Sequence, residues 1–93
     1  MSAHTATKHL AWIRAQPCCV RGCGKQPIQA HHVRTAANSG TGMKPDDLDT
    51  VPLCFHHHQA LHRCGRRTFE RAYGVDFAEC AAFYRAASLT EMP

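Results

Sequence analysis

No stretch of the sequence is apolar for long enough to span a bilayer, and the first residues, Met-Ser-Ala-His-Thr-Ala-Thr-Lys, lack the apolar core of a signal peptide. The chain also lacks internal repeats, low-complexity tracts and internal linkers. These absences argue against a membrane protein, a secreted protein and a repeat array. We therefore expect one cytoplasmic domain that covers residues 1–93 and has no membrane partner.

Acidic residues are also few: the chain has 7 Asp and Glu and 11 Lys and Arg. Its net charge is therefore +4 with histidine neutral. This balance favours a polyanionic partner. A chain of 93 residues buries a small core, and domains of this size often need a metal or a disulfide to fold. Since nothing indicates secretion, we expect the 6 cysteines to be reduced and partly metal-binding.

Histidine, in contrast, is abundant, and most of the 8 histidines lie in two short segments. His58 and His62 are four residues apart, so a helix would place both imidazoles on one face, where they could share an ion. A solvated His-rich helix would have the same spacing. His31 and His32 lie on a candidate strand and would point to opposite faces, so one could bind the ion while the other acts as a free base. His4 and His9 are expected to be exposed.

Four further residues have the spacing of a structural zinc site. Cys54 and His57 form a Cys-x-x-His pair, and Cys18 and Cys23 lie about thirty residues earlier in a segment rich in Pro and Gly. We predict that these four side chains bind structural Zn²⁺, with Cys19 as an alternative to Cys18. The competing interpretation, buried thiols without a metal, is disfavoured by the polar neighbours of Cys18 and Cys23.

Periodicity and turn residues predict a small α+β domain. We expect helices over residues 5–16, 55–64, 67–73 and 76–87, strands over 28–33 and 49–53, and a loop over 34–48. Thr5 or Thr7 is expected to cap the first helix and Asp76 the last. Most aromatic side chains should pack in the core or between helices: Trp12, Phe69, Tyr73, Phe77, Phe83 and Tyr84.

The order of these motifs resembles that of the HNH endonucleases, the ββα-metal nuclease family. The resemblance covers residues 17–65: the dyad His31-His32, a loop, the segment Asp49-Thr-Val-Pro-Leu-Cys-Phe-His-His-His, and His62 one turn later. Short phage-associated and prophage-associated HNH proteins are similar in this combination. The chain departs from the family pattern at Asp49, where the family has Asn, and at His57, where it usually has a second Cys.

The resemblance implies a ββα-metal domain with an N-terminal helix, a zinc knuckle and two C-terminal helices. It implies that His32 is the general base and that Asp49 orients it. His31, His58 and His62 would hold one catalytic divalent ion, which could be Mg²⁺, Mn²⁺, Ni²⁺ or Zn²⁺.

The activity that the resemblance implies is metal-dependent hydrolysis of phosphodiester bonds in DNA by a bacterial or phage-encoded endonuclease. Arg34, Lys44 and Arg63 neighbour the site and are the expected phosphate contacts, which supply affinity rather than sequence choice. We therefore expect little intrinsic specificity, with a homodimer or a protein partner supplying it. The alternatives are a non-catalytic, zinc-stabilised DNA-binding or adaptor module, which has no use for His32, and a metal-storage or metal-sensing protein.

Overall fold

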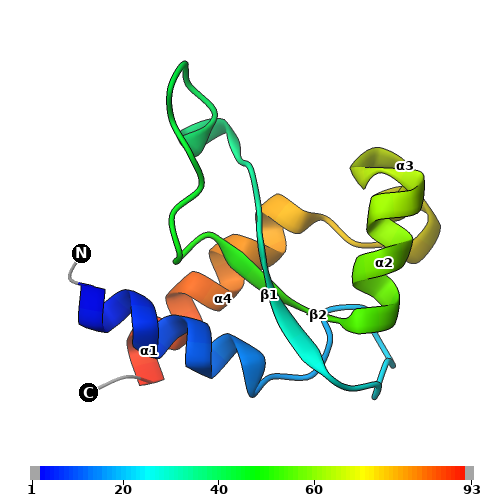
Figure 1. Ribbon diagram of the computed structural model, residues 1–93, viewed down its shortest axis with the longest axis horizontal. Coiled ribbons are helices and arrows are strands. Elements are labelled where there is room, and N and C mark those ends of the chain that lie inside the picture. Colours follow the sequence, from blue (N-terminus) through cyan, green and yellow to red (C-terminus); the bar gives the residue numbers. More distant parts are fainter. Residues whose placement is uncertain (1–2, 92–93) are drawn as a thin grey trace.

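Residues 3–91 are described in the computed structural model, and they form a small α+β domain (Figure 1). The elements are α1 (Ala3–Arg14), β1 (Ile28–His32), a 3-10 turn (Ala36–Asn38), β2 (Thr50–Cys54), α2 (Phe55–Cys64), α3 (Arg66–Tyr73) and α4 (Phe77–Glu91). Both predicted strands and all four predicted helices are confirmed, with ends that differ by a few residues. None of the described helices has the length and apolar character needed to cross a membrane.

The two strands form an antiparallel hairpin that leads directly into α2. Ile28 pairs with Cys54 and His32 with Thr50, so the dyad lies at the end of β1 that faces the start of β2. Pro52 lies in the middle of β2, which a two-stranded sheet tolerates because each strand has a free edge. That edge is used: the Cys19 amide donates to the Pro52 carbonyl at 2.8 Å and attaches the preceding turn to the strand.

The helices cover the hairpin in two pairs (Figure 1). In the first pair, α1 and α4 contact each other and the sheet, and Trp12 Nε1 donates to Glu91 Oε2 at 2.7 Å. In the second, α2 contacts both strands and α3. The largest side chains in the shared core are Phe69 and Phe77, both fully buried and stacked with ring centroids 5.6 Å apart. The dyad and the predicted metal helix therefore lie at the junction of the hairpin with the second pair.

Some of the predicted details are wrong at the helix ends and at single side chains. Helix α1 begins at Ala3, so Thr5 and Thr7 lie inside it rather than at its start. Asp76 does cap α4, since its Oδ1 accepts from the Glu79 amide at 3.1 Å. Phe83 was expected to pack but is 65% exposed, because it lies on the outer face of α4.

His9 is the other misplaced side chain: it was expected at the surface and is fully buried, while the side chain of His4 lies outside the described part. The ring of His9 lies 2.7 Å from Ser88 Oγ in α4 and 3.1 Å from Thr50 Oγ1 in β2. A buried polar side chain costs little when its hydrogen bonds are satisfied. No residue near His9 in the sequence reveals these partners.

Replacing Phe69 by alanine should lower the free energy of unfolding by about 3–5 kcal/mol, because a fully buried ring leaves a cavity. Phe83→Ala removes the same atoms from an exposed site and should change the free energy of unfolding by less than about 0.5 kcal/mol. Urea unfolding of the zinc-loaded variants measures both values. Equal losses would contradict this description of the core.

Candidate functional site

The sulfur atoms of three cysteines and one histidine nitrogen converge on one point. The ligand atoms of Cys18, Cys23, Cys54 and His57 all lie within 4.8 Å of one another. His57 Nδ1 is 3.2 Å from Cys54 Sγ and 3.6 Å from Cys18 Sγ, and Cys23 Sγ is 3.8 Å from Cys54 Sγ. A tetrahedral zinc ion with its usual bond lengths holds such ligands about 3.5–3.8 Å apart. This Cys3His cluster could therefore hold a metal such as zinc.

The local sequence explains how the Cys3His cluster is built. Gly22 adopts a positive φ of 79° and the Cys23 amide donates to the Val20 carbonyl at 3.1 Å, which folds the segment back on itself. Cys54 ends β2 and caps α2, since its Sγ accepts from the His57 amide at 3.3 Å. The strand thus passes into the helix without a loop.

Of the two candidates in the first pair, Cys18 joins the Cys3His cluster, while Cys19 packs against the core. Burial raises the pKa of the Cys18 thiol to about 11. In contrast, a hydrogen bond from the Lys25 amide lowers the pKa of Cys23. A thiolate at the buried Cys18 position therefore needs a cation beside it, which is the chemistry of a zinc ligand.

A second group of histidines lies between β1 and α2. His31 Nδ1 is 3.2 Å from His58 Nε2, and the rings of His58 and His62 are neighbours with centroids 4.8 Å apart. His58 Nδ1 donates to Gln29 Oε1, an oxygen that can only accept, so His58 carries its proton on Nδ1 and its Nε2 accepts from His31 Nδ1. In the described part of the chain, the tighter convergence within 4.8 Å is found at the Cys3His cluster alone, so the histidine trio is more open.

The electrostatics of this trio suit ligands that bind in the neutral form. Burial, helped by the nearby His58 and His62, lowers the pKa of His31 to about 4. Burial also lowers the pKa of His58. Both imidazoles are therefore neutral at pH 7, which is the form that coordinates a metal.

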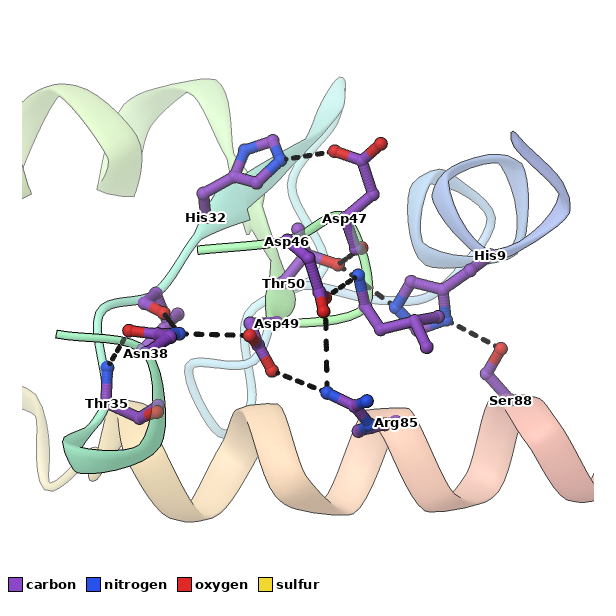
Figure 2. A network of polar contacts seen from close by, with 12 residues as sticks. His9, His32, Thr35, Asn38, Asp46, Asp47, Asp49, Thr50, Arg85 and Ser88 are labelled. Atoms are coloured by element: carbon purple, nitrogen blue, oxygen red, sulfur yellow. Dashed lines mark hydrogen bonds and ion pairs between the residues drawn. The ribbon is translucent and has the colours of Figure 1, made fainter. Parts of the chain in front are cut away.

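The two members of the dyad have different surroundings, as the alternation of a strand predicts. His31 is half-buried against His58 and the Phe77 ring, whose centroid lies 5.6 Å away. His32 is exposed, and its Nε2 lies 2.8 Å from Asp47 Oδ1 (Figure 2).

Asp49, expected to orient His32, is placed differently. Its carboxylate accepts from Asn38 Nδ2 at 3.0 Å and from an Arg85 guanidinium nitrogen at 2.9 Å (Figure 2). Its carbonyl accepts from the Val33 amide at 2.7 Å and so helps to close the hairpin. The structure thus brings Asp47, rather than Asp49, to His32. The sequence held no signal for this, because His32 and Asp47 are 15 residues apart and the path of the loop between them is not encoded by local spacing.

All three predicted phosphate contacts are exposed. Arg34 donates to the Met43 carbonyl at 3.3 Å, Lys44 is exposed in the loop, and Arg63 lines a hollow of about 390 Å³ with Gln59 and His62.

A second hollow, of about 420 Å³, lies outside the predicted contacts Arg34, Lys44 and Arg63, and its lining holds three arginines and two acidic residues. It lies along α3 and is lined by Arg66, Arg67, Glu70, Arg71, Val75 and Asp76. Arg66 connects it to the histidines, since its guanidinium lies 5.9 Å from the Phe77 ring centroid and Phe77 contacts His31. The run Arg66-Arg67 was the available signal. We call this hollow the arginine groove.

The fold and these clusters define a small α+β domain with a Cys3His cluster that could hold a metal. The chain belongs to the family described as "Protein of unknown function (DUF968)", whose sequence model matches residues 1–90. It is 37% identical over 67 residues to the Uncharacterized protein YdfU of Escherichia coli (strain K12). That match covers 72% of this chain and 18% of the relative, so the chain spans less than a fifth of that protein. No solved structure matches the chain.

Replacing Cys54 by serine should remove the bound zinc and unfold the domain, because a structural zinc site supplies on the order of 10 kcal/mol to such folds. Serine retains a side-chain oxygen that can cap α2, so loss of the cap alone is largely avoided. Cys64→Ser, at an exposed cysteine outside the Cys3His cluster, is the matched control and should leave both properties unchanged. Zinc content by mass spectrometry and the melting temperature provide the readouts. A Cys54→Ser protein that keeps its zinc and its melting temperature would rule out the site.

Proposed function

We propose that the protein is a metal-dependent endonuclease that hydrolyses phosphodiester bonds in DNA, on the ββα-metal plan of the HNH enzymes. The observation that carries this proposal is the division of the dyad. His31 faces two further histidines of α2, whereas its neighbour His32 is exposed and engages an acidic side chain. A purely structural zinc module would have no need for a second group of histidines beside its Cys3His cluster.

In this proposal His31, His58 and His62 would hold one divalent ion. When bound, such an ion neutralises charge on the phosphate and assists the departing 3′ oxygen. Imidazole ligands suit Zn²⁺, Ni²⁺ and Mn²⁺ better than Mg²⁺, which prefers oxygen, although HNH enzymes of this type are often active with Mg²⁺. His32 would accept the proton of the attacking water at its unprotonated ring nitrogen.

The basic residues support DNA as the substrate. Arg34 lies two residues after His32, and Arg63 directly follows His62. The arginine groove includes Arg66, which lies against the Phe77 ring beside His31, and Lys44 lies in the loop between the strands. Contacts of this kind bind phosphates in any sequence, so a second copy of the chain or a protein partner would supply the choice of site. We place the enzyme in the bacterial cytoplasm, encoded by the bacterium or by a phage.

The rival function is a zinc-stabilised DNA-binding or adaptor module without catalysis. It is favoured by one observation: in the described residues the Cys3His cluster converges more tightly than the histidine trio. The two functions differ in whether the protein cleaves DNA when a divalent ion is supplied.

His32→Ala should abolish metal-dependent nicking of supercoiled plasmid and leave the zinc content and melting temperature unchanged, because His32 is exposed and outside both metal-binding groups. His56→Ala, at another exposed histidine, is the matched control and should cleave normally. The assay supplies Mg²⁺, Mn²⁺, Ni²⁺ or Zn²⁺ to protein that retains its structural zinc. Full cleavage by the His32→Ala protein would exclude His32 as the base, and absence of cleavage by folded wild type with every ion would favour the binding module.

Removing Arg67 and Arg71 together should weaken DNA binding and lower the salt dependence of the affinity. Each lost phosphate contact should reduce the slope of log K against log salt by about 0.9, hence about 1.8 for the pair. Fluorescence anisotropy of a short duplex, in the His32→Ala background to prevent cleavage, measures the slope. The control removes equal charge from α1, which lies at the other end of the molecule from α3 (Figure 1), with Lys8→Ala and Arg14→Ala. An identical slope in both double variants would exclude the arginine groove as the DNA contact.

A further inference from the structure

We propose that Asp47 is the residue that positions His32, and that α1 and α4 hold Asp47 in place through a chain of buried hydrogen bonds. The inference rests on the proposed nuclease function for its catalytic consequence. The geometry on which it depends, however, can be observed in the protein without DNA.

The contact itself fixes which nitrogen of His32 is free. His32 Nε2 lies 2.8 Å from Asp47 Oδ1, and an ionised carboxylate can only accept a hydrogen bond. In a neutral ring the proton therefore lies on Nε2, and Nδ1 holds the lone pair that can take a proton from water. Both side chains are a little under half exposed, 45% for His32 and 44% for Asp47, so the ring is held at the surface, where a substrate can reach it.

The backbone of Asp47 is connected through Thr50 to His9 of α1 and Ser88 of α4 (Figure 2). Thr50 Oγ1 donates its one proton to the Asp47 carbonyl at 3.0 Å, so it accepts from His9 Nε2 at 3.1 Å. His9 Nδ1 then accepts from Ser88 Oγ at 2.7 Å. Burial, with a smaller contribution from Arg85, lowers the pKa of His9, which agrees with a neutral ring that donates once and accepts once.

A second branch of the network fixes the rest of the loop and accounts for Asp49. Arg85 of α4 reaches Asp49 at 2.9 Å and Asp46 at 4.0 Å. Asn38 connects Asp49 to the Val33 carbonyl, with 3.0 Å for each bond (Figure 2). In the described residues no buried side-chain nitrogen or oxygen lacks a partner. Asp49 therefore stabilises the loop between the strands, and Asp47 is the residue that contacts His32.

Through this network, α1 and α4, which lie outside residues 17–65, contribute to the proposed site. Ser88 and Arg85 belong to α4 and His9 belongs to α1. The loop carries Asp47, the partner of His32. A change in the packing of these helices would therefore alter the orientation of the His32 ring without affecting a proposed metal ligand. Asp47 and Arg85 are in this sense positioning residues, since they act through His32.

The test compares Asp47→Ala and Asp47→Asn, using nitrogen-15 NMR of the zinc-loaded protein to assign the tautomer of His32, together with plasmid cleavage. Wild type should show a single Nε2-protonated tautomer. Asp47→Ala should show a mixture and lose on the order of 10–100-fold in kcat with KM unchanged, the usual cost of removing a partner that orients a functional side chain. Asp47→Asn keeps the accepting oxygen and should restore the single tautomer and most of the activity. Glu79→Ala removes the same charge from an exposed site and should change neither readout.

A tautomer mixture in wild type, or identical tautomers in wild type and Asp47→Ala, would overturn the assignment of Asp47. So would an activity loss in Asp47→Ala that asparagine does not rescue or that follows a lowered melting temperature, because both indicate a merely structural role. If wild type holds the single tautomer but cleaves nothing, the positioning contact stands and the nuclease proposal fails. The two failures are therefore distinguishable.

Discussion

The Cys3His cluster is the constraint on which the other features depend, because it joins the turn after α1 to the junction between β2 and α2. Successive residues of a helix differ in direction by about 100°, so a fixed His57 also fixes how α2 is rotated. With His57 directed at Cys18 and Cys54, His58 faces His31 on β1, and His62 follows one turn later on the same side. The structural site and the proposed reactive site are thus set by adjacent residues of one helix.

The two histidines of the dyad lie on opposite faces of β1 and therefore have different partners. The half-buried member faces the histidines of α2, whereas the exposed member is oriented by the loop between the strands. That loop is anchored by α1 and α4 rather than by the metal-binding segments. The proposed reactive site therefore depends on two separate groups of residues: the Cys3His cluster, which fixes the direction of the histidines of α2, and the polar network, which holds the loop that contacts His32.

The parts of the site that the sequence predicts are those that depend on short spacing. The pair Cys54 and His57 and the pair His58 and His62 are each within one helical turn, so a correct helix assignment places them together. The separate directions of His31 and His32 follow from strand alternation. His32 and Asp47 are 15 residues apart in the sequence, and His9 and Ser88 are 79 apart, so neither contact leaves a local pattern in the sequence. The same reason explains why Asp49 was assigned to His32 and why His9 was expected at the surface.

The central claim is that the protein has two separate metal sites, one holding the fold and the other serving the reaction. Zinc K-edge X-ray absorption on protein loaded with one and then two equivalents of zinc tests this most directly. The first equivalent should show three sulfur ligands at about 2.3 Å and one nitrogen at about 2.0–2.1 Å, and the second should add only nitrogen and oxygen. Uptake of a single equivalent, or a second ion that also binds sulfur, would contradict the account.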